Sequence, residues 1–266
     1  MPTSTRTYAT AQLIGTRAVQ CDATAVRTAP DGARAYVLLD GIGTSEAIRA
    51  WTRAAARSLA LAACRQGDAE AGLRRVYRRF ADDPDRYGPH KLPGAAAVVA
   101  VTAPGKPLTV AWCGDSRAYL VGQGAIARRL TDDHNLRRVW PPTAMAEGGN
   151  RNTITSYLGA IEDAAERMDC FGHPEIESTA VPLDRPARLV LASDGAYEPC
   201  EAARYCLDTE LGYTPLTPTA REFVHLAIET AHDLAPAGTR TAAIADNATV
   251  LLADLPRPDL PRPDLA

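Results

Sequence analysis

The stretch Leu189-Val190-Leu191-Ala192-Ser193-Asp194-Gly195 decides the fold class of this chain. Its four apolar residues are typical of a short strand that is buried on both faces, and the run ends abruptly at a carboxylate. The glycine that follows permits a tight backbone turn directly after the acidic residue. The sequence therefore places Asp194 at the exit of a buried strand.

The same arrangement recurs elsewhere in the chain. Residues 36–39 lead into Asp40-Gly41, residues 110–113 lead into Gly114-Asp115, and Asp246 shortly precedes a strand-like run. Uncompensated carboxylates repel one another, so four of them at strand ends indicate a site that holds a cation. Carboxylate oxygens are hard ligands, and they favour Mg²⁺ or Mn²⁺ over Zn²⁺.

Six short strings make the pattern specific. In chain order they are VLLDGIG (37–43), GDSRAYL (114–120), LTDDH (130–134), ITSYLG (154–159), LASDG (191–195) and DNATV (246–250). Each is weak alone, since Asp-Gly is a common turn. Together, and in this order, they resemble the metal-dependent protein phosphatases of type 2C. The resemblance covers about residues 7–254 and implies a four-layer sandwich.

The resemblance also implies a ligand set. It assigns Asp40 to bridge two Mg²⁺ or Mn²⁺ ions, the backbone carbonyl of Gly41 to bind the second ion, and Asp194 and Asp246 to bind the first. In bacterial members a third, looser ion uses the residue that corresponds to Asp115 together with Asp194. Asp115 fits a turn-capping carboxylate equally well, and the sequence leaves both interpretations open.

Two residues near the N-terminus complete the expected site. In the family an arginine four or five residues before an aspartate binds the substrate phosphate, and Arg17 and Asp22 have this spacing. A guanidinium matches two phosphate oxygens at once. Asp22 then orients metal-bound water. The alternative for Arg17 is a solvated surface arginine.

The sequence departs from the family at three positions that bear on chemistry. Cys21 stands where an acidic residue usually precedes the aspartate, which removes one outer carboxylate. Ile42 stands where many eukaryotic members carry a histidine for leaving-group protonation. Ser156 replaces a common arginine near the loop that is thought to gate the substrate.

The remaining pattern predicts an α+β chain, most simply two stacked, mainly antiparallel sheets with helices outside. A hairpin over 23–28 and 35–39 feeds Asp40, and the run 95–130 reads as an antiparallel meander of four strands. Further strands are expected over 174–182, 187–192 and 247–252. Helices are expected over 44–65, 69–80 and 221–234, with another starting near Asp132. In the first helix the off-stripe residues Arg49, Arg53 and Arg57 should face solvent.

Length and composition limit the number of domains and the classes of partner that the chain suggests. The 266 residues are 46% apolar, which suits a single domain over 1–254 followed by a flexible proline-rich tail over 255–266. A net charge of −3 gives no sign of a nucleic-acid partner, and no apolar run reaches the length of a membrane span. The N-terminus lacks the apolar core of a signal peptide, and six scattered cysteines favour free thiols in the cytoplasm.

The sequence thus predicts a cytoplasmic serine/threonine protein phosphatase. Its partners would be phosphorylated proteins and an opposing serine/threonine kinase, an assignment that rests on the resemblance. Two alternatives stay open. One is a catalytically weak binding module, suggested by Cys21 and Ser156. The other is a hydrolase of small phosphate esters, which would need a narrow pocket with residues 141–160 closed over it.

Overall fold

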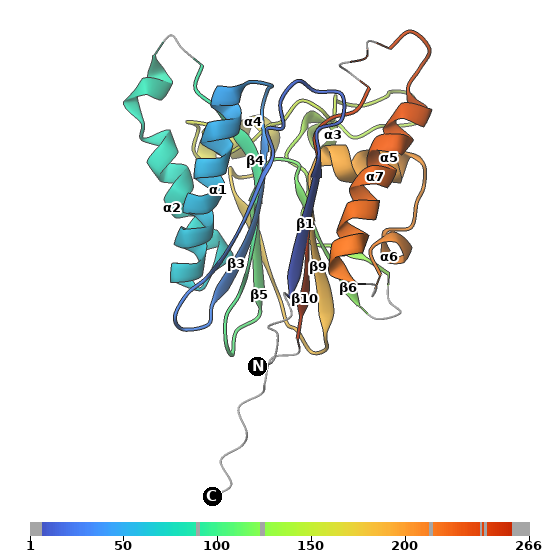
Figure 1. The fold of residues 1–266 in the computed structure, drawn as a ribbon. Helices are drawn as coiled ribbons and strands as arrows, with labels where there is room; N and C mark the ends of the chain where they lie inside the picture. The colour runs from blue at the N-terminus through green and yellow to red at the C-terminus, as the bar shows by residue number, and fades with distance from the viewer. Residues whose placement is uncertain are drawn as a thin grey trace, which may run out of the picture.

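Two stacked sheets form the centre of the molecule (Figure 1). The computed structural model describes residues 7–88, 91–122, 126–212, 215–239, 241 and 244–256, and within these ranges each sheet has five antiparallel strands. Sheet 1 has the order β1 (Tyr8–Leu13), β10 (Ala248–Leu255), β9 (Ala187–Ala192), β6 (Arg117–Gly122) and β7 (Arg128–Arg129). Sheet 2 has the order β2 (Ala23–Thr28), β3 (Arg34–Gly41), β4 (Ala95–Thr102), β5 (Leu108–Cys113) and β8 (Glu177–Val181).

Helices cover the outer face of each sheet, which gives the four layers that the sequence predicts. The helices α1 (Glu46–Gln66) and α2 (Ala69–Ala81) pack on sheet 2, while α5 (Asp194–Ala202) and α7 (Leu216–Leu234) pack on sheet 1 (Figure 1). Each sheet forms a hydrophobic core with its own helices, and a third core lies between the sheets and includes Leu38, Val98, Leu189 and Leu251. The short helices are η1 (Pro84–Tyr87), α3 (Leu136–Val139), α4 (Ala164–Phe171) and α6 (Leu207–Glu210).

Local signals explain where the two long helices of sheet 2 begin. The Ser45 hydroxyl accepts a hydrogen bond from the Ile48 N–H, and the Asp68 carboxylate accepts one from the Ala71 N–H. Both are N-caps that satisfy otherwise unpaired backbone donors. Gly67, in the left-handed region at φ 59°, ends α1 and separates it from α2. The sequence prediction of two consecutive helices here is confirmed.

The predicted meander is wrong at its centre. β4 pairs with β5 in sheet 2, but β6 pairs with β9 and β7 in sheet 1. The chain crosses between the sheets at Gly114, whose φ of 116° is a left-handed conformation that glycine adopts easily. The strands β5 and β6 are both apolar on the side that faces the core between the sheets, so the periodicity of the sequence does not show that they belong to different sheets.

Other boundaries also differ from expectation. The helix expected near Asp132 is the single turn α3, and α7 begins at Leu216 instead of Arg221. The helices α4, α5 and α6 lie in segments that the sequence pattern left unassigned. The expected proline-rich tail falls almost wholly on residues 257–266, which lie outside the described residues. Among the residues described, no helix has the length and apolarity needed to cross a membrane.

Candidate metal centre

The strand exits singled out in the sequence meet at one end of the sandwich. A cavity of about 680 Å³ opens there, and its lining includes Arg17, Asp40, Gly41, Asp115, Asp194 and Asp246. Asp40 ends β3, Asp115 follows β5, Asp194 follows β9 and Asp246 precedes β10. Residues that are up to 229 positions apart in the sequence therefore share one cavity.

The Asp40-Gly41 turn is fixed by close packing. A Cβ atom at Gly41 would lie 2.6 Å from the carbonyl oxygen of Cys21 and 2.7 Å from the Thr52 hydroxyl. The next residue, Ile42, donates its N–H to the Gly94 carbonyl at 2.9 Å and lines the cavity. Only glycine fits at position 41, so the turn that carries Asp40 has a defined path.

Asp115 is held by contacts of its backbone, and one oxygen of its carboxylate has no partner among the described residues. It is buried, and its Oδ1 atom has no hydrogen-bond partner among the described residues. The hydroxyl of Tyr197 donates to the Asp115 carbonyl at 2.9 Å, and the His134 N–H donates to the Gly114 carbonyl at 2.9 Å. An unpartnered buried carboxylate oxygen is costly, so this atom suits a ligand role.

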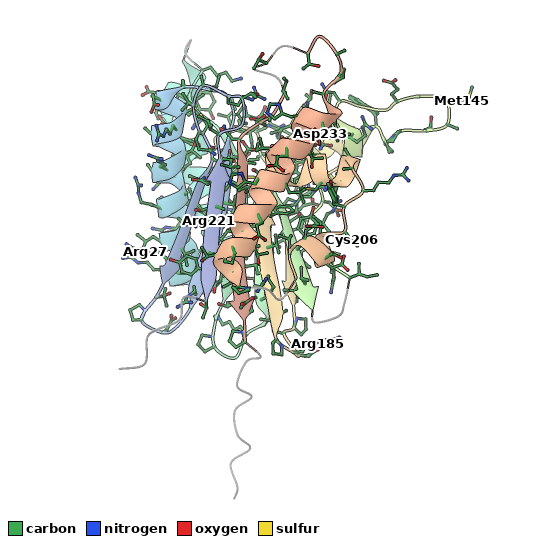
Figure 2. All side chains as sticks on the ribbon, turned by 45° about the vertical axis from the view of Figure 1, so that its right-hand side comes forward. Arg27, Met145, Arg185, Cys206, Arg221 and Asp233 are labelled. Carbon is green, nitrogen blue, oxygen red and sulfur yellow. The ribbon has the colours of Figure 1, made fainter. Side chains whose placement is uncertain are left out.

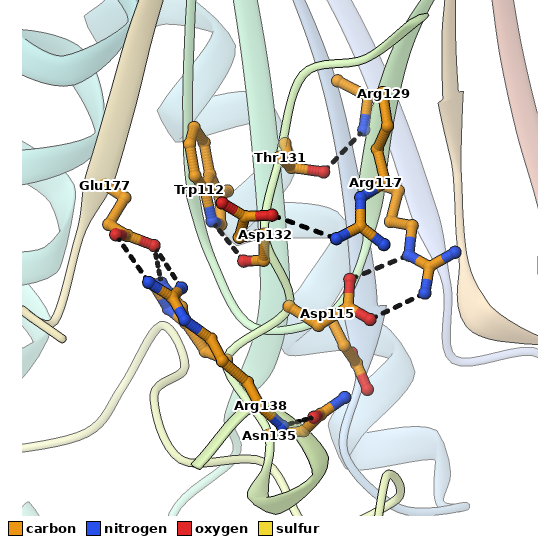
Figure 3. Close-up of polar contacts among 12 residues, drawn as sticks. Trp112, Asp115, Arg117, Arg129, Thr131, Asp132, Asn135, Arg138 and Glu177 are labelled. Carbon is orange, nitrogen blue, oxygen red and sulfur yellow. Dashed lines mark hydrogen bonds and ion pairs between the residues drawn. The ribbon is translucent and has the colours of Figure 1, made fainter. Parts of the chain in front are cut away.

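A polar network lies next to this turn (Figure 3). The Arg117 guanidinium bonds both oxygens of Asp133 at 2.8 and 2.7 Å and stacks 3.8 Å from the centre of the Tyr197 ring. The Trp112 indole donates to the Asp132 carbonyl at 2.7 Å. The string LTDDH therefore braces the turn, while its histidine lies outside the cavity lining.

Glu177 anchors that histidine. It accepts two hydrogen bonds from Arg138, at 2.5 and 3.0 Å, and lies 2.8 Å from His134 Nε2 (Figure 3). His134 is fully buried and stacks on His173 with ring centres 4.2 Å apart. These contacts make His134 a structural residue that positions the Gly114 backbone.

Asp194 and Asp246 each turn one oxygen toward the following backbone. Asp194 Oδ1 accepts from the Gly195 N–H at 2.6 Å, and Asp246 Oδ1 accepts from the Asn247 N–H at 2.8 Å. The other oxygen of Asp246, Oδ2, accepts from Arg17 Nη2 at 2.5 Å. Arg17 thus lines the cavity, with its side chain 38% exposed to solvent.

The surroundings of these aspartates disfavour the ionised form of their carboxyl groups. Burial, reinforced by the charges of neighbouring aspartates, raises the pKa of Asp40, Asp115 and Asp194 above the usual range. Burial and the charges of Asp194 and Asp246 raise the pKa of Asp22 to about 8. A bound cation would offset this repulsion, so the donor set fits Mg²⁺ or Mn²⁺ chemically.

The side chains are not arranged as a finished coordination shell. Among the described residues, no three Asp, Glu, His or Cys side chains lie together in a way that could hold one ion. Asp246 has both oxygens engaged, one by its neighbouring N–H and one by Arg17. Binding of an ion at Asp246 therefore requires the Arg17 side chain to move.

Asp22 lies beside this cavity and does not line it. Its side chain is 2% exposed, neither carboxylate oxygen has a hydrogen-bond partner, and it lines a second cavity of about 500 Å³. The preceding residue, Cys21, is 1% exposed and donates its N–H to Asn247 Oδ1 at 2.7 Å. Ser156 is also fully buried and donates to the Glu175 carbonyl, away from the cavity.

The sequence pattern did not identify two residues that line the cavity, Glu198 and Arg151. Glu198 lines the cavity, and burial together with the charge of Asp194 raises its pKa to about 7. Arg151 lies 3.2 Å from Glu198 and also lines the cavity. The spacing of four residues between Asp194 and Glu198 would have revealed Glu198, because α5 begins at Asp194 and places both on one helix face.

Comparison with known families gives one partial match. Residues 33–138 match the family model "Protein phosphatase 2C". This segment runs from β3 through α3, so it includes the Asp40-Gly41 and Gly114-Asp115 turns.

Solved structures match almost the whole chain. A serine/threonine phosphatase of Streptococcus agalactiae superposes with a TM-score of 0.67 and 20% identity, over 92% of this chain and 97% of that one. The phosphatase Stp1 of Staphylococcus aureus gives 0.64 and 17%, over 95% and 96%. The Mycobacterium tuberculosis phosphatase PstP/Ppp gives 0.59 and 22%, over 94% and 98%. At these identities the similarity establishes the fold.

Curated proteins give a different and shorter match. Two vitamin B12-dependent ribonucleoside-diphosphate reductases from Mycobacterium tuberculosis strains are 31% identical over 163 residues. The match covers 56% of this chain but only 22% of each reductase. The chain thus spans about a fifth of the length of these curated relatives, and the reductase name describes those longer proteins.

Proposed function

We propose that the chain is a metal-dependent serine/threonine protein phosphatase of the 2C type, because residues 33–138 match that family model and the whole chain shares its fold with bacterial serine/threonine phosphatases. The observation that carries the proposal is the cavity at the end of the sandwich. Asp40, Asp115 and Asp194 line it with raised pKa values, and Asp115 Oδ1 has no partner among the described residues. Such a donor set is suited to divalent cations with oxygen ligands.

The aspartates would divide the work of holding two ions. Asp40 would bind both ions, Asp194 and Asp246 would bind the first, and the Gly41 carbonyl would bind the second. Asp115 would bind a third, looser ion together with Asp194. When bound, Mg²⁺ or Mn²⁺ supplies a water that is acidic enough to be a nucleophile at neutral pH and offsets charge on the transferring phosphoryl group.

Arg17 would bind the phosphate of the substrate. Its guanidinium already occupies the cavity wall, 2.5 Å from Asp246, and its planar donors match two phosphate oxygens. The guanidinium would leave Asp246 Oδ2 and pair with the phosphate of the substrate. Asp22, buried next to the cavity, would orient the attacking water from behind the ligand residues.

A protein substrate agrees with the surroundings of the cavity. Small-ester hydrolysis would require residues 141–160 to close over it. Met145, in the middle of that loop, is 95% exposed and projects away from the body of the molecule (Figure 2). Arg151 and Asn152, from the same loop, line the cavity. Phosphorylated proteins, and a serine/threonine kinase that phosphorylates them, are the proposed partners.

The proposal is tested by hydrolysis of para-nitrophenyl phosphate and of a phosphothreonine peptide, with Mn²⁺, with Mg²⁺ and with chelator. We expect turnover with metal, its loss with chelator, and a preference for the peptide. Calorimetric titration with Mn²⁺ provides a readout besides activity. A folded chain that neither binds Mn²⁺ nor hydrolyses either substrate would overturn the proposal and favour the binding module. A preference for the small ester would favour the third alternative.

A further inference from the structure

A second cavity lies along the flank of the sandwich, where β2 meets α1. It has a volume of about 500 Å³ and is separate from the metal cavity in its lining residues. We call it the β2 pocket. Its lining comprises Gln12, residues 22–27, Arg53, Arg57 and Ala60.

One wall of the β2 pocket is a free sheet edge. β2 is the outermost strand of sheet 2, and within the described part of the chain no strand pairs with its other side. An edge strand exposes a row of backbone N–H and C=O groups that can pair with an added strand. Exposure increases along the strand, from the buried Ala23 through the partly buried Ala25 and Val26 to the exposed Arg27. The edge therefore offers both hydrogen-bonding groups and small apolar contacts.

The other wall is basic. Arg53 and Arg57 lie one turn apart on α1, and Arg27 lies near the end of β2; all three are exposed. None of them makes an ion pair or side-chain hydrogen bond with another described residue, whereas Arg49 of the same helix pairs with Glu46. The one acidic residue in the lining, Asp22, is 2% exposed.

We propose that the β2 pocket docks an acidic, extended segment of a partner protein. The segment adds a strand to the free edge of β2, and its carboxylates on one side face Arg53 and Arg57. Three arginines without counterions beside an unpaired strand edge are complementary to this chemistry. Nucleic acid is disfavoured, because the net charge of the chain is −3 and the edge offers directional peptide hydrogen bonds.

The β2 pocket lies near the metal cavity and shares no lining residue with it, although Asp22, which we propose to orient the attacking water, lines the β2 pocket. The segment before α1, including Thr44, lines the metal cavity. With a rise of about 1.5 Å per residue, Arg53 and Arg57 lie about 10.5 and 16.5 Å along α1 from its first residue, Glu46. A partner can thus occupy the β2 pocket while the metal cavity stays open.

The test uses the full chain and fluorescein-labelled ten-residue peptides. The acidic probe alternates Glu and Val, a second replaces Glu by Lys, and a third has proline at every Val position. We expect the acidic probe to bind with an affinity that falls with salt, and the Lys and Pro probes to bind at least tenfold more weakly by fluorescence anisotropy. Equal binding of the acidic and Lys probes overturns the proposal, as does tighter binding of a labelled single-stranded DNA.

Matched charge reversals locate the site. R53E/R57E should weaken binding of the acidic probe about tenfold, since two attractions become repulsions. The control R75E/R78E makes the same charge change on exposed arginines of α2, outside the pocket, and should bind like wild type. Thermal melts confirm that both variants fold.

Hydrogen exchange should show protection of residues 23–28 upon binding. Equal loss in both variants, or protection elsewhere only, overturns the proposal. Chelator should leave binding unchanged, so the result is independent of phosphatase activity.

Discussion

Arg17 Nη2 lies 2.5 Å from Asp246 Oδ2, so a guanidinium neutralises one of the aspartates at the mouth of the metal cavity. Both side chains are about 40% exposed, and the pair is the sole ion pair of Asp246 among the described residues. If Asp246 binds a metal ion as proposed, the arginine would compete with that ion for the same oxygen. The pairing would then connect metal binding with phosphate binding, because Arg17 would have to leave Asp246 before the ion could bind there.

Arg17→Ala should raise KM for a phosphothreonine peptide about tenfold and lower kcat less, because the arginine binds phosphate in the ground state and in the transition state alike. The same variant should bind Mn²⁺ at least as tightly as wild type, since Asp246 loses its competitor. Steady-state kinetics at saturating Mn²⁺ and calorimetric titration measure the two effects. Arg17→Lys serves as the control and should recover part of the KM. An unchanged KM would remove Arg17 from the site.

Asp194→Asn and Asp246→Asn should each lower kcat by more than about 100-fold, because loss of even an outer partner of a metal ligand costs 10–100-fold. In chelator Asp194→Asn should melt at the same temperature as wild type or higher. The reason is that the pKa of Asp194 is raised by burial and by the charge of Asp246, so removal of its charge relieves repulsion. Retained turnover in both variants would eliminate the proposed first metal position.

The stability of the chelated protein should fall as pH rises from about 4 to about 8. Burial and nearby aspartates raise the pKa of Asp22 to about 8, above the ordinary value of 3.8. Between these two pKa values Asp22 holds a proton in the folded state that it has lost in the unfolded state. The stabilisation from this proton is therefore fully present below pH 3.8 and is lost as the pH rises toward about 8.

Melting temperatures of wild type and Asp22→Asn, measured at intervals from pH 4.5 to 8 in chelator, test this sign. Asp22→Asn should flatten the decline. Mn²⁺ should raise the melting temperature more at pH 8 than at pH 6, because the ion binds deprotonated carboxylates. A melting temperature that rises with pH in chelator would contradict the assignment.

The sequence predicted those parts of the site that depend on local signals. Asp40, Asp115 and Asp194 are each preceded by a short apolar strand, so their placement at strand ends followed from composition and turn residues. The four layers followed from the order of elements. The transfer of β6 to the other sheet did not, because strand pairing is a long-range choice and both strands have the same apolar pattern. Glu198 was missed because α5 was not recognised as a helix that begins at Asp194.

Glu177→Ala should lower the free energy of unfolding by about 2 kcal/mol, because it leaves the buried His134 and the partly buried Arg138 without their shared acceptor. Burial works against ionisation of this carboxyl, but hydrogen bonds from Arg138 and His134 prevail and lower its pKa to about 2. This stabilisation is present above the ordinary value of 4.5 and is lost as pH falls toward 2. Denaturant unfolding at pH 7 measures the effect.

The control Glu222→Ala changes an exposed glutamate of α7 that has no ion pair among the described residues, and it should stay within about 0.5 kcal/mol of wild type. Because His134 holds the Gly114 backbone next to Asp115, Glu177→Ala should also weaken Mn²⁺ binding, whereas Glu222→Ala should not. Equal stability of the two variants would show that the Glu177 network contributes nothing to the turn that carries Asp115.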